Sequence, residues 1–396
     1  MNRRHDIDAL RALAFALVIL YHVAMYYVDG WAWHLKSPHA AAWLQSPMRI
    51  LNLWRMDLVF LVSGLALAIL LGRSAPGALL RQRSWRLLLP LAFGMAVVVP
   101  FQPYAQALAN GATGPGFGEF LLRYFTGGPW PKGAFDGSDV GVTWNHLWYL
   151  PYLWVYTVLA VVLLRSRPAQ RLQRTFLALR GWRLVLLPVL PLAAWSVLLW
   201  PHFPPTRDLV RDGWLHAVYF TLFLYGCWIG TDAGWWDAVR RLRWPLLAGA
   251  GAALGLTLLL RLGLPPAGPS PWRLAVRLAS DAYLWLTILA ILGWAHQHLN
   301  RPWPWLRWSN ESVYPWYVLH QTVLVVAIFW LAPLALGPVV EPLLLVAATI
   351  AGCWAITAVV RRVRWLRPLF GLGPRPQAAS AASMSRARDS GLSIGA

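Results

Sequence analysis

The sequence predicts an all-α, polytopic integral membrane protein with about ten transmembrane helices and both termini in the cytoplasm. Of its 396 residues, 58% are apolar and 13% are charged, and the mean hydropathy is +0.49. Soluble domains carry about 25% charged and about 45–50% apolar residues. The composition therefore excludes an ordinary soluble protein, a disordered chain and a fibrous one, and a bilayer is the expected solvent.

Ten apolar runs are long enough to cross a bilayer, which takes about 20 residues of helix. The first run is too long for the core of a signal peptide, so we interpret it as a retained helix. Ser309 or Asn310 is expected to cap the ninth helix. The expected spans are residues 9–28, 51–71, 86–104, 147–164, 184–200, 214–231, 245–262, 275–295, 312–335 and 339–360.

We expect one ten-helix transmembrane domain over residues 1–370. Residues 371–396 are rich in Ala, Ser and Arg, which indicates a disordered cytoplasmic tail. The net charge of +20 suggests either a nucleic-acid partner or the orientation of a membrane protein. Most Lys and Arg residues fall in the segments that ten spans place in the cytoplasm, so we expect a lipid bilayer and no nucleic acid as the partner.

The first span carries an acid, a base and an imidazole on one predicted face. Arg11 and His22 are eleven residues apart, which is close to three full helical turns and about 16 Å along the axis. Asp8 lies one turn before Arg11. An isolated histidine is most often a packed core residue, but ionisable groups are costly in a membrane and three on one face favour a functional site.

The second span opens with Arg55 and Asp57, within the outer part of the membrane. The simplest interpretation is that these charges neutralise one another or pair with a neighbouring helix. Ser63 and Gly64 follow in the same span, and small residues of this kind let helices pack closely.

Arg83 and Arg86 stand one turn apart at the start of the third span. Arginines in this position usually mark the cytoplasmic side of the membrane. The functional alternative is phosphate binding, because paired guanidinium groups match phosphate oxygens in bidentate geometry.

Further polar and aromatic candidates occur on the outer side and in the ninth span. Trp33 and His34 follow the first span, and aromatic rings there either anchor in lipid or stack on sugars. His146 ends the longest outer loop, as a substrate-binding group or an interfacial polar residue. Tyr317 and His320 are three residues apart on one helix face, where they would line a buried polar cavity.

In order and spacing, these motifs resemble the acyltransferase-3 family of bacterial membrane O-acyltransferases, and in particular its glucan-modifying branch. The resemblance extends from about residue 5 to residue 365. The motifs are Ile7-Asp8-x-x-Arg11 followed by His22, Trp33-His34-x-x-Ser37, Arg55-Met-x-x-x-Phe60-x-x-Ser63-Gly64, Arg83-x-x-Arg86-x-x-x-Pro90, His146-Leu-Trp-Tyr149, and Asn310-x-Ser312 through Tyr317-x-x-His320.

The resemblance implies an enzyme of the bacterial inner membrane. It would use acyl-CoA as a co-substrate from the cytoplasm, hold no permanently bound cofactor, and acylate a hydroxyl of a periplasmic glycan. Imidazole suits proton transfer near neutral pH, so we expect His22 to be the general base. The other expected roles are catalysis for Arg11, Asp8 and His320, binding of coenzyme A for Arg83 and Arg86, and substrate binding for Trp33, His34, Arg55, Asp57, His146 and Tyr317.

The two cysteines, Cys227 and Cys353, lie in apolar stretches and indicate neither a disulfide framework nor a metal site. No serine or cysteine is an evident nucleophile, so direct acyl transfer is the preferred mechanism, with an acyl-enzyme relay as the alternative.

Two other functions are compatible with the pattern, namely a proton-coupled transporter or acyl-donor flippase, and a non-catalytic membrane scaffold. An acyltransferase requires Arg11, His22, Arg83 and His320 around one tunnel. A transporter would instead show two pseudo-symmetric helix bundles.

Overall fold

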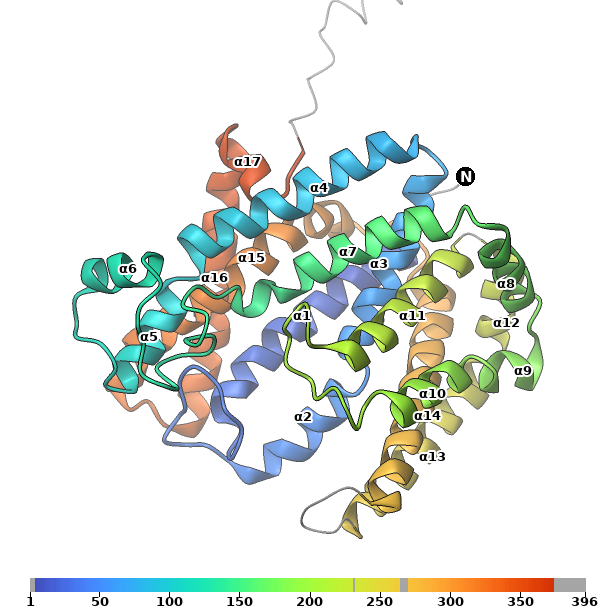
Figure 1. The fold of residues 1–396 in the computed structure, drawn as a ribbon, viewed down its shortest axis with the longest axis horizontal. Helices are drawn as coiled ribbons and strands as arrows, with labels where there is room; N and C mark the ends of the chain where they lie inside the picture. Colours follow the sequence, from blue (N-terminus) through green and yellow to red (C-terminus); the bar gives the residue numbers. More distant parts are fainter. Residues whose placement is uncertain (1–3, 231, 264–269, 374–396) are drawn as a thin grey trace, which may run out of the picture.

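The computed structural model describes residues 4–230, 232–263 and 270–373. In this part of the chain the backbone forms helices and loops, with no strand (Figure 1). Nine helical segments here are long and apolar enough to cross a membrane, and the 17-residue helix α11 is a shorter apolar one. The expected all-α polytopic architecture is confirmed, whereas the expected tail lies outside the described residues from residue 374 onward.

The helices enclose a central α1, which contacts α3, α14, α15 and α16 (Figure 1). Their bounds are α1 (His5–Tyr27), α2 (Gln45–Asn52), α3 (Arg55–Leu71), α4 (Pro76–Phe93), α5 (Phe101–Ala109), α6 (Phe117–Phe125), α7 (Tyr149–Leu163), α8 (Arg167–Leu177), α9 (Gly181–Leu186), α10 (Val189–Leu198), α11 (Gly213–Ile229), α12 (Ala233–Arg241), α13 (Arg243–Leu262), α14 (Pro271–His298), α15 (Trp305–Leu331), α16 (Gly337–Arg362) and α17 (Leu366–Leu369).

Several helices extend beyond the apolar runs that predict them. The third span begins at Pro76 and passes through Pro90 and a π-helical turn at Gly94–Val98 into α5. The expectation that Ser309 or Asn310 caps the ninth span is wrong, because α15 begins at Trp305 and both residues lie inside it. Hydropathy identifies only the apolar part of a helix, so it does not predict the more polar turns at the ends of the helix.

Helices α3 and α11 pack closely, as the small residues of the second span predict. A Cβ added at Gly64 would collide with the carbonyl oxygen of Phe223, and one added at Gly226 would collide with that of Leu61. Two backbones therefore touch at this crossing. The contact fixes α3, and with it Arg55 at its first position, against the rest of the bundle.

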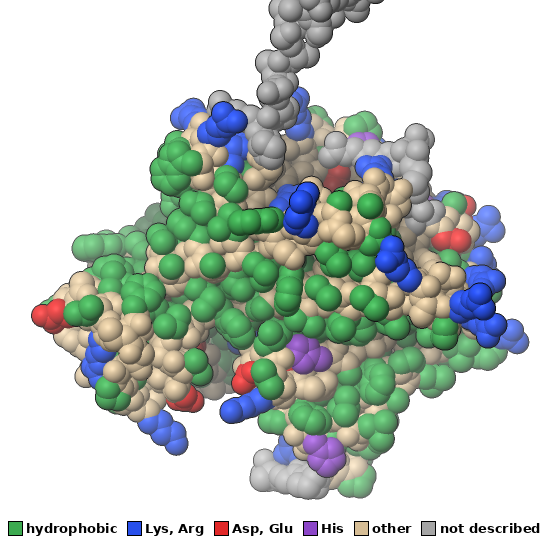
Figure 2. Space-filling model, turned by 45° about the horizontal axis from the view of Figure 1, so that its top comes forward, with side chains coloured by type: hydrophobic (Ala, Val, Ile, Leu, Met, Phe, Trp, Pro, Cys, Tyr) green, Lys and Arg blue, Asp and Glu red, His purple; other side chains and the backbone are tan. Residues whose placement is uncertain are grey.

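The surface is that of a protein surrounded by lipid. Figure 2 shows hydrophobic side chains in a broad band across the molecule, with arginine and lysine side chains gathered mainly toward its upper and right-hand edges. The start of α1 and the short helix α17 lie at the same side of the molecule (Figure 1). This agrees with an even number of membrane crossings between them.

We expect Gly64→Ala to lower the melting temperature of the purified protein, because the added methyl group must push apart two helix backbones. Overpacking of this kind typically costs about 1–3 kcal/mol. Gly251→Ala on α13 is the matched control, since nothing lies within 4 Å of its added Cβ. That variant should be unchanged or slightly stabilised by its helix propensity. Equal melting temperatures for the two variants would contradict close packing at Gly64.

Candidate active site

One cavity of about 1820 Å³ passes between the central helices. It exceeds the roughly 300–1,000 Å³ of a typical small-molecule pocket, so it has room for more than one ligand. We call one end the arginine-rich end, lined by Arg4, Asp8, Arg11, Arg73, Arg83 and Arg86. We call the other the loop end, lined by Trp31, Trp33, His34, Asp136, Val140, Arg207 and Asp208.

Every site residue predicted from the sequence lines this cavity. Asp8, Arg11 and His22 all face it, as their helical spacing predicts. The cavity also brings Arg83 on α4 and His320 on α15 onto the same wall as Arg11 and His22, so these four residues surround one space. The remaining predicted residues on its wall are Arg86, Trp33, His34, Arg55, Asp57, His146 and Tyr317.

At the middle of the cavity, His22 on α1 and His320 on α15 are in contact. The Nδ1 atom of His22 lies 3.3 Å from Nε2 of His320. It also lies 2.8 Å from the carbonyl oxygen of Val18. The Nδ1 atom of His320 faces two carbonyl oxygens of its own helix, at 2.9 and 3.1 Å.

These contacts determine where the proton sits on each neutral ring. A carbonyl oxygen only accepts, so both Nδ1 atoms carry the proton and both lone pairs lie on Nε2. His320 Nε2 accepts a hydrogen bond from His22. The Nε2 atom of His22 has no hydrogen-bond partner among the described residues, and the ring lines the cavity. This nitrogen is therefore a free basic site.

His146 is buried in the cavity wall, whereas a loop residue that contacts a glycan would be exposed. It is buried, its Nε2 donates to the carbonyl oxygen of Val318 at 3.1 Å, and its Nδ1 accepts from Gln102 at 3.3 Å. The Tyr317 hydroxyl donates to the His146 carbonyl at 2.7 Å, and the His146 and His320 rings are 5.0 Å apart. Both ring nitrogens are thus occupied, so His146 supports the cavity wall.

Near the loop end, His34 belongs to a buried amide network. Its Nδ1 donates to Gln106 at 2.8 Å, and its Nε2 accepts from Gln321 at 2.7 Å. The Gln321 amide also donates to Gln102 at 3.0 Å. Burial lowers the pKa of His34 below its usual 6.5, although the nearby Asp136 carboxylate raises it in part. His34 is therefore neutral near pH 7.

The arginine-rich end places three guanidinium groups, those of Arg11, Arg83 and Arg86, on the cavity wall. Arg11 lies 3.6 Å from Asp8 and donates to Asn310 at 2.5 Å. Nε of Arg83 is buried without a hydrogen-bond partner among the described residues. Arg86 donates to the carbonyl oxygen of Gly371, at 3.2 and 3.3 Å. Positive groups with spare donors at a cavity mouth can bind an anionic ligand.

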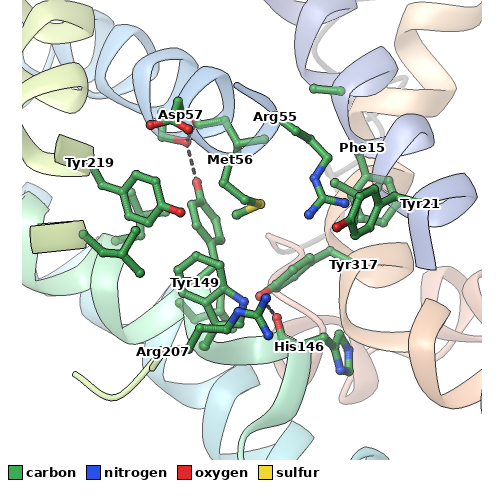
Figure 3. Close-up of a pocket in the computed structure, with 18 of the residues that line it drawn as sticks. Phe15, Tyr21, Arg55, Met56, Asp57, His146, Tyr149, Arg207, Tyr219 and Tyr317 are labelled. Atoms are coloured by element: carbon green, nitrogen blue, oxygen red, sulfur yellow. Dashed lines mark hydrogen bonds between the residues drawn. The ribbon is translucent and has the colours of Figure 1, made fainter. Parts of the chain in front are cut away.

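The structure does not support mutual neutralisation of Arg55 and Asp57. Nε and Nη1 of Arg55 and Oδ1 of Asp57 are buried without hydrogen-bond partners in the described parts of the chain. Instead, the Arg55 guanidinium stacks on the Tyr21 ring, 3.4 Å from its centroid. Figure 3 shows Arg55 beside Tyr21, and Asp57 on the other side of the space beside Tyr219.

Sequence reasoning missed the glutamines of this site. Gln102 and Gln106 lie one turn apart on α5, and Gln321 follows His320 on α15. A search for ionisable groups passes over uncharged amides. Nevertheless, two glutamines at i and i+4 in an otherwise apolar span were a visible signal of a buried polar face.

Comparison with known proteins yields one family. A family model described as an acyltransferase domain matches residues 4–358. No curated protein and no solved structure matches the chain.

We expect His34→Gln to make the melting temperature less sensitive to acid. The pKa of His34 is lower in the folded protein than in the unfolded chain, so its contribution to stability is complete above about pH 6.5. That contribution is lost as the pH falls through the folded-state pKa. Melting curves between pH 7.5 and 5 should therefore drop less steeply in this variant. His202→Gln, at an exposed position, should follow the wild-type profile; an unchanged slope for His34→Gln would refute this assignment.

Proposed function

Because the chain belongs to the acyltransferase-3 family, as the match over residues 4–358 shows, we propose that it acylates a periplasmic or cell-envelope glycan from cytoplasmic acyl-CoA. Family membership makes it a membrane acyltransferase for groups other than amino-acyl groups. The donor, the acceptor and the bacterial inner membrane as its location are our proposal. The observation that carries it is one cavity with a histidine pair at its middle and arginines at one end.

In this mechanism the acceptor hydroxyl attacks the thioester carbonyl carbon. His22 Nε2 takes the hydroxyl proton as the new C–O bond forms, and the proton passes to the coenzyme A thiolate as the C–S bond breaks. His320 is a positioning residue, because its Nε2 holds the Nδ1–H of His22 and so keeps the basic nitrogen toward the cavity. No acyl-enzyme intermediate is needed.

The donor would enter at the arginine-rich end. Arg83 and Arg86 would bind the coenzyme A phosphates, with Arg83 the stronger contact because Arg86 already donates to Gly371. The pantetheine arm must then cover the roughly 16 Å between the levels of Arg11 and His22, which an extended arm approaches. We assign Asp8 and Arg11 to this entry path, since they lie that far from the reacting atoms.

The acceptor would enter from the loop end. Trp33 offers a ring for stacking on a sugar, and Gln321 offers an amide oxygen beside the histidine pair. His34 and His146 hold these groups in place through the amide network. The resemblance to the glucan branch, whose type member is glucans biosynthesis protein C, supports a periplasmic glucan acceptor with a succinyl or acetyl group.

We expect His22→Ala to abolish glycan acylation while the protein still inserts and folds. General base catalysis contributes about 10²–10⁴-fold to a rate. The readout is mass spectrometry of periplasmic glycans from cells that carry each variant as their sole copy. His298→Ala, at the exposed end of α14, should retain acylation.

Near-normal acylation by the His22→Ala variant would overturn the proposed mechanism. If the wild-type protein instead moved protons or an acyl donor across vesicles and left glycans unmodified, the transporter alternative would hold.

We expect Arg83→Ala to weaken binding of coenzyme A by roughly tenfold or more, because it removes charge-assisted hydrogen bonds to phosphate. Arg81→Ala is the control, since Arg81 is exposed, lies two residues away and does not line the cavity. Isothermal titration of the detergent-solubilised variants measures both affinities. Equal affinities would exclude Arg83 from the donor site.

A further inference from the structure

A second, smaller cavity lies between α2 and α13. Its volume is about 440 Å³, within the roughly 300–1,000 Å³ of a typical small-molecule pocket. We call it the α2–α13 groove, and its lining residues fall within 46–53 and 254–262. Helix α2 and the end of α13 lie on the side of the molecule opposite α17, which the expected topology places at the outer face of the membrane (Figure 1). None of the site residues predicted from the sequence lines this groove.

Two arginines line the groove, one from each helix. Arg49 on α2 donates to the side-chain oxygen of Gln45 at 3.3 Å, and Arg261 on α13 is half-buried. The two guanidinium groups lie within electrostatic reach of one another, and no carboxylate in the described part of the chain forms an ion pair with either. Such like charges repel each other, whereas an anion between them would be attracted by both. The arrangement therefore favours an anionic ligand.

The rest of the groove is mainly apolar. Leu258 and Leu259 line it and are exposed to the surroundings of the protein. Gly255 lines it as well, and a Cβ added there would meet nothing within 4 Å, so the groove is open at this position. Guanidinium groups beside leucines match a molecule that is an anion at one end and a hydrocarbon at the other.

Tryptophans indicate the depth of the groove in the membrane, because their rings gather at the level of the lipid headgroups. The Trp31 ring centroid lies 5.8 Å from the guanidinium carbon of Arg49. The Trp272 indole donates to the carbonyl oxygen of Leu260, the residue before Arg261, at 2.5 Å. The arginines are therefore at the depth of the lipid phosphates.

The leucines of α13 continue from this level toward the middle of the membrane. Leu258 and Leu254 precede Arg261 by about one and two helical turns. They line the same groove as the arginine, so a hydrocarbon chain that descends from a bound phosphate would lie against them.

We propose that the α2–α13 groove binds one phospholipid of net negative charge, with its phosphate between Arg49 and Arg261 and an acyl chain along the leucines of α13. A zwitterionic lipid binds less tightly, because its ammonium group brings a positive charge to two guanidinium groups. This inference concerns a second site and does not depend on which donor and acceptor the enzyme uses.

The groove borders the central cavity, which gives the lipid a structural role. Leu53 lines both spaces. It follows the last residue of α2 and precedes Arg55, the first residue of α3, by two positions. A ligand that binds only the folded protein stabilises it. A lipid packed against Leu53 thus stabilises the junction between α2 and α3, and with it this part of the cavity wall.

The test uses the full-length protein in detergent with equal amounts of phosphatidylglycerol and phosphatidylcholine that carry the same acyl chains. Native mass spectrometry measures how much of each lipid is retained. The wild-type protein should prefer phosphatidylglycerol by about tenfold, the range for two arginines beside an anionic headgroup. Arg49→Gln and Arg261→Gln should each lower the preference by roughly fivefold. Arg211→Gln, at an exposed position outside both cavities, should keep it.

Gly255→Leu tests the apolar part of the groove, because it fills the open space and leaves both arginines in place. It should lower the retention of phosphatidylglycerol. Gly251→Leu is the matched control, since it lies one turn earlier on α13, has equally open space around its added Cβ and does not line the groove. Melting curves of all variants verify folding.

Each other outcome overturns the proposal in a distinct way. Equal retention of the two lipids by the wild-type protein, or an unchanged preference in both arginine variants, excludes the arginines as a headgroup site. Equal losses in Gly255→Leu and Gly251→Leu exclude the groove as the place of the acyl chain. Displacement of phosphatidylglycerol by excess inorganic phosphate, but not by sodium chloride of equal ionic strength, would show an anion site that does not require a lipid.

Discussion

A helix inside a bilayer satisfies its own backbone hydrogen bonds, but it cannot satisfy a charged or amide side chain that faces lipid. Each charged or amide group in a span must therefore turn toward another polar group or toward a cavity. In this protein that requirement gathers charged and amide side chains from α1, α3, α4, α14 and α15 around one central space. The histidine pair, the amide network and the stacking of Arg55 on Tyr21 all follow from it.

The same requirement explains how much the sequence could predict. Helical phase was sufficient to place Asp8, Arg11 and His22 on one surface, because a regular helix converts spacing into direction. Arg83 and Arg86 were recognisable because charge is rare in this chain. The glutamines of α5 were missed because they carry no charge, and the start of α15 was misplaced because Arg307 and the polar residues 309–311 interrupt the apolar pattern near its beginning.

Other features depend on how helices meet and have no signature in the sequence. The contact of His22 with His320 joins residues 298 positions apart. Whether Arg55 and Asp57 neutralise one another or interact with a neighbouring helix depends on which side of the cavity each one faces, and spacing along the chain does not show this. The tautomers of the histidines likewise depend on carbonyl groups that only the folded backbone brings into place.

The cavity touches both ends of the bundle, and this has a consequence for the energetics of the cell. Moving one elementary charge through 100 mV yields about 2.3 kcal/mol, so an open aqueous path through an energised membrane would dissipate its ion gradients. An enzyme that joins a donor on one side to an acceptor on the other must therefore connect two compartments without conducting. The arginines at one end of the cavity repel cations, and Gln321 on its wall is fixed by hydrogen bonds to His34 and Gln102. In the proposed reaction, the groups that position the substrates would also have to limit the passage of ions.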